Sequence, residues 1–346
     1  MRDFKYLFAY TIPISVLLSI EFRGAFSFTT FLYAYGIIPL FELIIKPNNS
    51  SESEDRELSG FKNLLFDIML YMNLPIVFFT LGYGFLVLNS ESMYLYEQIG
   101  IIFSLAILLA TNGINVAHEL GHRKSLIEKV FSKTLLMFSL YMHFFIEHNL
   151  GHHKNVGTSL DPASAKLNQN LYHFWFTSTI GQYKNAWEIQ LKKLSGNNFF
   201  SINNQLLIYS FIQIGYLFLL FLIWGLSGVF YGVIVAVISF LMLETINYIE
   251  HYGLRRRKLS SGRFERVNPS HSWNSNHKIG RIVLYELTRH SDHHYKSSKK
   301  YQHLENIIES PQLPYGYPAS MLLASVPFLW FSIMNKHIEK YNSSLS

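Results

Sequence analysis

Cysteine is absent from this chain of 346 residues. Its absence excludes disulfide bridges, cysteine-ligated zinc and any iron–sulfur or rubredoxin-like centre held by the chain itself. Charged residues are also scarce, at 15% of the sequence, whereas ordinary soluble proteins carry roughly a quarter. Hydrophobic residues make up 49% and aromatic residues 16%. This balance is not typical of a soluble protein.

Apolar residues are gathered in long blocks. A helix needs about 20 apolar residues to cross the hydrocarbon core of a bilayer. Blocks of about this length occur at about 4–21, 25–45, 63–88, 98–117, 203–226 and 228–248. We therefore predict an all-α integral membrane protein with six transmembrane helices. The first block has no small-residue cleavage site and is interpreted as a retained span.

The placement of lysine and arginine predicts the orientation, because these residues gather on the cytoplasmic side. With a cytoplasmic N-terminus, the outer turns carry a single basic residue, Arg23, and the run Arg255–Lys258 lies inside. We therefore expect both termini in the cytoplasm. The whole chain, 1–346, is expected to form a single membrane-embedded domain with a cytoplasmic helical cap made of 118–202 and 249–346.

Three shorter segments receive their own predictions. Residues 46–62 are typical of a polar connector. Residues 130–146 are apolar but contain Lys133 and His143, which favours an amphipathic or re-entrant helix on the membrane face. Residues 316–334 are short, rich in aromatic residues and interrupted by proline, which favours an interfacial position.

Histidine is the most informative residue type. Nine of the fifteen histidines fall in four clusters: HELGH from His118, EHNLGHH from Glu147, a single histidine after the sixth span, and HSDHH from His290. In the first cluster the histidines are four residues apart and share one helix face, as metal binding from a helix requires. Nine neutral imidazoles suit two ions of zinc, copper, iron or nickel better than one. The nine are His118, His122, His148, His152, His153, His251, His290, His293 and His294.

Acidic residues stand beside each cluster. Glu119, Glu147, Glu250 and Asp292 could accept hydrogen bonds from the ring nitrogens that do not bind metal, which would orient the rings. Isolated histidines near a membrane face are usually surface or interfacial residues. This interpretation applies to His143, His173, His271, His277, His303 and His337.

With these motifs, the sequence resembles the membrane-bound alkane 1-monooxygenases, within the wider class of histidine-box desaturases and hydroxylases. The boxes HELGH, EHNLGHH and RHSDHH are those of the class, and NYIEHYGL at 247–254 is typical of the narrower family. Weaker matches are DPASA at 161–165, PYGYP at 314–318 and IPL at 38–40. The resemblance covers essentially the whole chain.

The resemblance implies a six-helix bundle that holds two non-haem irons through the nine histidines named above. It also implies that the irons use dioxygen and two electrons to hydroxylate the terminal carbon of n-alkanes taken from the bilayer. The chain would lie in a bacterial inner membrane. Because no flavin or iron–sulfur motif is present, we expect a separate rubredoxin-type carrier and its reductase as partners, and no nucleic acid. The basic run Arg255–Lys258 is a candidate docking patch for an acidic carrier, or simply a positive-inside anchor.

Alternative functions remain open at this stage. HELGH also fits the zinc-protease pattern H-E-x-x-H, with Glu119 as general base, but that chemistry leaves six clustered histidines without a role. A metal transporter would place its polar groups within the membrane rather than past the span ends. Desaturation, or hydroxylation of a xylene-like methyl group, shares the same ligands. The second span contains Phe26, Phe28, Phe31, Tyr33 and Tyr35, and the sequence does not reveal which of them faces a substrate cavity.

Overall fold

The fold is helical throughout the part of the chain that this computed structural model describes, residues 2–45, 47, 60–90, 92–194, 196 and 198–345. Within these ranges, β-structure is limited to two isolated bridges, Lys258–Phe264 and Asn274–Gln312. The predicted all-α class is therefore confirmed. The predicted connector at 46–62 lies almost entirely outside the described residues.

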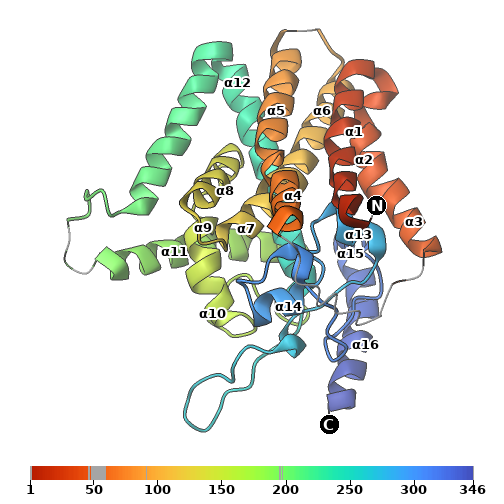
Figure 1. Cartoon of the computed structure of the whole chain (residues 1–346), viewed down its shortest axis with the longest axis vertical. Coiled ribbons are helices and arrows are strands. Elements are labelled where there is room, and N and C mark those ends of the chain that lie inside the picture. The colour runs from red at the N-terminus through yellow and green to blue at the C-terminus, as the bar shows by residue number, and fades with distance from the viewer. Residues whose placement is uncertain are drawn as a thin grey trace.

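The first half of the chain supplies most of the long apolar helices (Figure 1). The α-helices of this half are α1 (Thr11–Phe22), α2 (Thr29–Leu32), α3 (Ile38–Ile44), α4 (Gly60–Tyr71), α5 (Asn73–Ser90), α6 (Leu95–Leu108), α7 (Asn115–Gly121) and α8 (Leu126–Phe138). Short 3-10 segments cover Arg2–Tyr10 and Gly24–Phe28, and π-helical segments cover Tyr33–Ile37 and Leu109–Ile114. The π segments join neighbouring α-helices into continuous runs.

The second half combines one very long helix with many short ones. The α-helices are α9 (Phe144–Glu147), α10 (His153–Asn155), α11 (Leu171–Leu194), α12 (Gln205–His251), α13 (Lys278–Val283), α14 (His290–Tyr295), α15 (Tyr317–Ala324) and α16 (Pro327–Leu345). A π-helical turn covers His148–His152, and 3-10 turns cover Pro269–His271 and Tyr301–His303.

Five helical stretches are long and apolar enough to cross a membrane. They are Phe4–Phe22, Gly24–Ile44, Asn63–Ser90, Leu95–Gly121 and Gln205–His251. The first four coincide closely with the first four predicted blocks. The fifth has 47 residues, about twice the length that one bilayer crossing needs.

This fifth stretch is in fact two helices joined at Gly225, whose backbone is not helical (φ 65°, ψ −151°). Glycine adopts a positive φ without the steric cost that other residues carry. Figure 1 shows the ribbon of α12 turning back at this point, so its two arms form a hairpin. These arms correspond to the predicted blocks 203–226 and 228–248.

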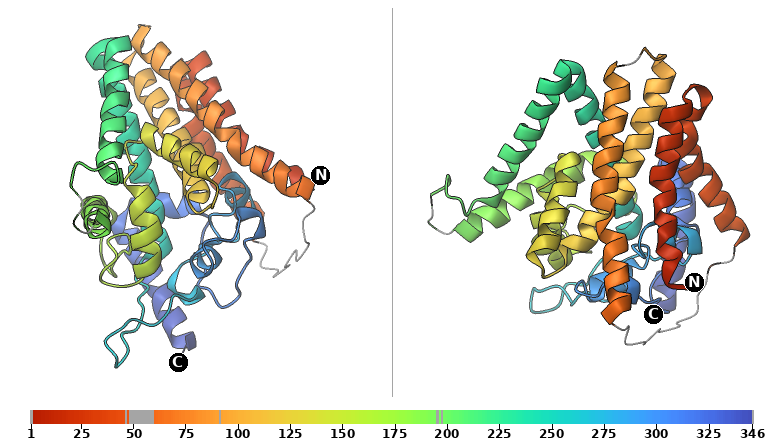
Figure 2. Two further views of the ribbon diagram at one scale, coloured as in Figure 1. Left: turned by 60° about the vertical axis from the view of Figure 1, so that its left-hand side comes forward. Right: turned by 45° about the horizontal axis from the view of Figure 1, so that its top comes forward.

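The short helices of the second half gather at one end of the long ones. The views in Figure 2 place both termini at this end, away from the turn of α12 and the α5–α6 connection. A second core holds this region together. Tyr248 and Tyr252, both from NYIEHYGL, pack against Trp330 of α16 with ring centroids 5.5 and 5.4 Å apart. The C-terminal helix therefore braces the end of α12 that carries His251.

Two predicted segments have different boundaries in the structure. A single helix over 130–146 is wrong: α8 starts earlier, at Leu126, and ends at Phe138, and a turn containing Leu140 with φ 53° precedes α9. Because this positive φ is incompatible with a continuing helix, α8 and α9 are separate helices. The segment 316–334 is also divided, between α15 and α16.

Candidate metal centre

The nine clustered histidines come together in two adjoining groups. The larger group consists of His118, His122, His148, His153 and His293, and the smaller of His152, His251, His290 and His294. Within each group, one ring nitrogen from every histidine lies within 4.8 Å of the others. The two groups touch, since the rings of His153 and His294 are 4.5 Å apart. Each group therefore could hold one metal ion.

The helix geometry of the first box works as its spacing predicts. His118 lies in α7, and His122 is the C-cap of that helix. Residues four apart lie on one face of an α-helix, and the two Nε2 atoms are 3.4 Å apart. The Leu109–Ile114 π segment precedes this box within the same apolar run.

The second box divides its histidines between the groups because its backbone is a π turn. The backbone N–H of His153 donates to the carbonyl of His148. This bond places side chains five residues apart, rather than four, above one another on the same face. Consequently the Nε2 atoms of His148 and His153 approach to 3.0 Å. His152, between them in sequence, turns to the other group, where its Nε2 lies 3.2 Å from that of His294. π turns of this kind are frequent at functional sites.

The distances between ring nitrogens fit metal ligands. Contacting Nε2 atoms are 2.9 to 3.4 Å apart in the two groups. Metal–nitrogen bonds of about 2.1 Å place adjacent donors on one ion about 3.0–3.4 Å apart. Hydrogen bonds alone do not explain the arrangement. The Nε2 of His290 faces the same atom of both His251 and His294, and one ring nitrogen offers either one hydrogen or one lone pair, so it forms only one well-aligned hydrogen bond.

The electrostatics of the site keep most of these rings neutral. Burial, followed by the neighbouring imidazole of His152, lowers the pKa of His122 to about 3. Burial and surrounding imidazoles also lower the pKa of His148 and His293 well below the usual value. Because a metal binds the deprotonated ring nitrogen, these rings do not have to lose a proton before they bind an ion at neutral pH.

His152 is the exception, and Asp161 is the reason. The Nδ1 of His152 lies 3.0 Å from Oδ2 of Asp161, and both side chains are buried. Burial lowers the pKa of His152, but the charge and hydrogen bond of Asp161 outweigh it and raise the pKa. Asp161 also accepts from the hydroxyl of Ser164 at 2.5 Å and the backbone N–H of Ala163 at 3.0 Å. A carboxylate on the other ring nitrogen is the arrangement that orients a metal-binding histidine.

Sequence reasoning did not assign this role to Asp161. The signal was the DPASA motif, which was noted as a family match without a function. Three of the four carboxylates that were expected to orient the rings contact other residues instead. Glu119 pairs with Arg123 at 2.7 Å, Glu147 accepts from Asn185 at 2.8 Å, and Asp292 pairs with Lys299 at 2.8 Å.

Glu250 is the one of the four that contacts a histidine of the site. Its Oε2 lies 3.2 Å from the Nε2 of His290, the nitrogen that faces the group, rather than from Nδ1. Its Oε1 accepts a hydrogen bond from the hydroxyl of Tyr317 at 2.8 Å. The carboxylate therefore lies on the same side of His290 as the other ring nitrogens, and not behind the ring as expected.

None of the six isolated histidines joins either group. The surface interpretation is wrong for three of them, His143, His271 and His277, which are buried. His143 packs between the rings of Tyr141 and Tyr183, and His271 contacts Glu265 at 3.2 Å. Tertiary packing, which single-residue reasoning does not capture, buries them.

An all-helical chain with membrane-spanning stretches and two adjoining groups of buried imidazoles defines a membrane protein with a histidine-lined metal centre. Comparison with known sequences narrows this class. The family model described as fatty acid desaturase matches residues 96–322. The chain is 34% identical to alkane 1-monooxygenase 2 of Alcanivorax borkumensis, over 99% of this chain and 92% of that protein. It is 32% identical to alkane 1-monooxygenase 2 of Pseudomonas aeruginosa, over 95% of this chain and 89% of that protein.

A more distant relative is the xylene/toluene monooxygenase hydroxylase component of Pseudomonas putida, which is 29% identical over 78% of this chain and 73% of that protein. The chain therefore belongs to the fatty acid desaturase family and, within it, to the alkane 1-monooxygenases. The resemblance on which the sequence analysis relied is confirmed.

Proposed function

We propose that this chain is a di-iron monooxygenase that hydroxylates the terminal carbon of n-alkanes. In the reaction, an alkane, dioxygen, two electrons and two protons give a 1-alkanol and one water. The observation that carries the proposal is the pair of histidine groups in a chain so similar to alkane 1-monooxygenases. The zinc-protease alternative needs one ion with three protein ligands, which two groups of five and four histidines do not favour.

Iron is the proposed metal, with the nine histidines of the two groups as its ligands. Imidazole suits zinc, copper and nickel as well, so the choice of iron rests on the family. Two bound irons would supply the dioxygen-derived oxidant that breaks an unactivated C–H bond, chemistry that amino-acid side chains cannot provide. The chain's own contribution is to hold the alkane, orient it and exclude water.

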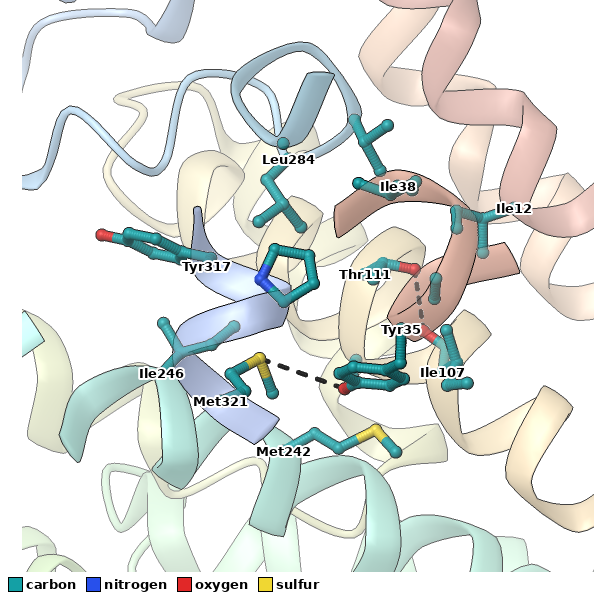
Figure 3. Close-up of a pocket in the computed structure, with 15 residues that line it drawn as sticks. Ile12, Tyr35, Ile38, Ile107, Thr111, Met242, Ile246, Leu284, Tyr317 and Met321 are labelled. Carbon is teal, nitrogen blue, oxygen red and sulfur yellow. Dashed lines mark hydrogen bonds between the residues drawn. The ribbon is translucent and has the colours of Figure 1, made fainter. Parts of the chain in front are cut away.

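An apolar cavity is the proposed binding site for the alkyl chain (Figure 3). Its wall is formed by side chains of α1, the second span, the fourth span, α12 and the cap, and almost all of it is hydrocarbon or sulfur. Residues that line it include Ile12, Tyr35, Ile38, Ile107, Met242, Leu284, Tyr317 and Met321. An alkane gains roughly 0.8 kcal/mol for each methylene removed from water, so an apolar wall suits this substrate.

Tyr317 connects the cavity to the metal centre. Its ring lines the cavity, while its hydroxyl donates to Glu250, which in turn contacts His290. Figure 3 shows the hydroxyl pointing away from the cavity. Tyr317 therefore presents the carbon atoms of its ring to the substrate, and its hydroxyl forms its hydrogen bond outside the cavity. We propose that the reacting end of the alkane lies beside this residue.

We also propose that the chain forms one domain with six spans in a bacterial inner membrane, with both termini and the cap in the cytoplasm. The two arms of α12 account for the fifth and sixth spans. The basic hairpin 255–266, which projects from the cap (Figure 1), supports this orientation by the positive-inside rule. The electrons would come from a separate rubredoxin-type carrier that docks at this hairpin. A reductase would in turn reduce the carrier.

The test is product analysis of membranes that contain the full chain. They are supplied with octane, NADH, and a surrogate rubredoxin and reductase under 18O2, and extracts are analysed by gas chromatography and mass spectrometry. We expect 1-octanol labelled with one 18O, and none from membranes with His290→Ala. Metal analysis should give two irons per chain. Absence of any alkanol across chain lengths, or one zinc per chain, contradicts the proposal.

A methyl hydroxylase of alkyl-aromatic compounds is the second candidate, favoured by the xylene/toluene relative. The same assay with p-xylene separates the two functions. A higher kcat/KM for p-xylene than for every n-alkane from hexane to hexadecane would support this candidate instead.

A further inference from the structure

Two lysines of α8 lie near a third from α11, and none of the three has an acidic partner among the residues that the structure describes. Lys129 and Lys133 are four residues apart and lie on one face of α8, and Lys193 lies in the last turn of α11. Among the residues that the structure describes, no carboxylate lies within ion-pair distance of their amino groups. Burial, then the charges of Lys129 and Lys193, lower the pKa of Lys133. The ammonium group of Lys133 therefore lies within electrostatic range of both Lys129 and Lys193.

Lys133 is held in place by two aromatic rings. Its Nζ lies 4.7 Å from the ring centroid of Phe145 and 5.3 Å from that of Tyr209. Cation–π contacts of this kind stabilise a partly buried ammonium group, but they supply no counter-charge. The amino group is thus positioned for an anion that comes from outside the chain.

The surroundings of the lysines indicate which anion this is. Tyr209 lies in the first turns of α12, just past its N-cap Asn204, so Lys133 lies beside the start of an apolar span. Exposed apolar side chains flank them on both sides: Leu126, Ile127 and Val130 on α8, and Phe211 and Ile214 further along α12. An ion in bulk water would not require exposed hydrocarbon around its site, whereas a lipid would.

We propose that Lys129, Lys133 and Lys193 form a binding site for the phosphate of an anionic phospholipid, whose acyl chains lie along the first arm of α12. Basic pockets between helices near the cytoplasmic membrane face bind such headgroups, and each lysine near the surface strengthens the attraction. The lipid would also hold α8 and α11 against α12. This inference does not depend on the proposed activity.

The test measures lipid binding to the full-length, delipidated protein in detergent. Dioleoyl-phosphatidylglycerol, dioleoyl-phosphatidylcholine and inorganic phosphate are titrated separately, and the thermal unfolding midpoint and the bound lipid, counted by native mass spectrometry, are recorded. We expect phosphatidylglycerol to raise the midpoint and to bind at about one molecule above background. Phosphatidylcholine and phosphate should do neither. An equal effect of phosphatidylcholine, or of phosphate alone, overturns the proposal.

Variants locate the site. The triple variant Lys129→Gln, Lys133→Gln, Lys193→Gln should bind phosphatidylglycerol on the order of a hundredfold more weakly, at about fivefold for each lysine. The matched control changes three exposed lysines elsewhere, Lys184, Lys336 and Lys340, to glutamine, and should keep wild-type affinity. Lys133→Arg, which retains the charge and the ring contacts, should also keep it. Equal losses in the control and the triple variant, or unchanged binding in the triple variant, overturn the proposal.

Should the triple variant fold poorly, the double variant Lys129→Gln, Lys193→Gln leaves the ring contacts of Lys133 intact. It should lose affinity by roughly 25-fold. Wild-type affinity in this folded variant overturns the proposal.

Discussion

The carboxylate of Asp161 lies 3.0 Å from Nδ1 of His152, whose Nε2 faces that of His294 at 3.2 Å. The Asp161→Asn variant retains the shape but loses the negative charge that orients and strengthens the ring as a ligand. Metal affinity or activity should fall by about 10- to 100-fold. The measurement is metal content after dialysis against graded chelator. Asp292→Asn provides the comparison, because Asp292 pairs with Lys299, and it should lose much less metal. Equal losses would contradict the role of Asp161.

Metal removal should destabilise the fold. Nine imidazoles point their nitrogens at one another, and a ligand that binds only the folded state stabilises it by mass action. We expect chelation to lower the thermal unfolding midpoint by several degrees and added Fe(II) to restore it. Magnesium, which prefers oxygen ligands, should not restore it. An unchanged midpoint after complete iron removal would show that the ions do not contribute to folding.

Tyr35 should influence the preferred length of the alkane. It is the aromatic residue of the second span that lines the cavity, and its hydroxyl lies 4.0 Å from the sulfur of Met321. Tyr35→Ala opens space at this point, so the product profile of a hexane-to-hexadecane panel should shift toward longer chains. The control is Phe26→Ala, because Phe26 is 63% exposed and does not line the cavity. The same profile in both variants would remove Tyr35 from this role.

The basic hairpin 255–266 should attract the acidic electron carrier, but only some of its arginines are available for this role. The guanidinium of Arg256 donates to the carbonyls of Glu265, Lys154 and Val156, so it anchors the hairpin beside the second histidine box. Arg257 has an 85% exposed side chain, although its Nε donates to Glu265 at 3.1 Å, and Arg263 is exposed. The docking test therefore has to use these two and leave Arg256 intact.

The double reversal Arg257→Glu, Arg263→Glu should slow reduction by an acidic carrier about tenfold at low salt, and the difference should shrink as salt is added. Stopped-flow reduction of the enzyme provides the rate. Lys336→Glu, Lys340→Glu on α16 makes the same change of charge on exposed residues elsewhere and should leave the rate nearly unchanged. Equal rates for both double variants at low salt would exclude docking at the hairpin.

A buried ion cluster should make stability depend on pH. Glu286 lies 2.7 Å from Arg281 and 3.2 Å from Lys5. Burial opposes its charge, but Arg281 and Arg289 outweigh burial and lower the pKa of Glu286 to about 2. Because the carboxyl has a lower pKa in the folded protein than in the unfolded chain, where it is near 4.5, its charge stabilises the fold above pH 4.5. This stabilisation is lost as the pH falls toward 2. The contribution at pH 7 is roughly 3 kcal/mol.

Glu286→Gln should therefore lower the unfolding midpoint at pH 7, and its difference from wild type should shrink steadily from pH 4.5 downward. Thermal unfolding across pH 3–8 measures both. The exposed Glu339→Gln serves as the control and should show no such trend. A difference that does not change with pH would assign the effect of Glu286→Gln to packing alone.

Much of the site could be predicted from the sequence because its chemistry is local. The spacing in HELGH places His118 and His122 on one helix face, whatever surrounds them. The apolar blocks that form the long apolar helices are likewise a property of consecutive residues. All nine candidate ligands predicted from the sequence appear in the two groups. The lack of cysteine also settled, without any structure, that the chain has no iron–sulfur centre of its own.

Tertiary structure alone decided how these parts are used. His152 joins a different group from its neighbours His148 and His153 because a π turn rotates the backbone. Asp161, rather than any of the four carboxylates beside the boxes, meets the Nδ1 of a clustered histidine because a loop folds back over nine residues. Which second-span aromatic lines the cavity, and which arginine is an anchor, depend on contacts between residues far apart in the chain. Spacing along a sequence fixes the direction of side chains within one helix, but it does not specify what packs against them.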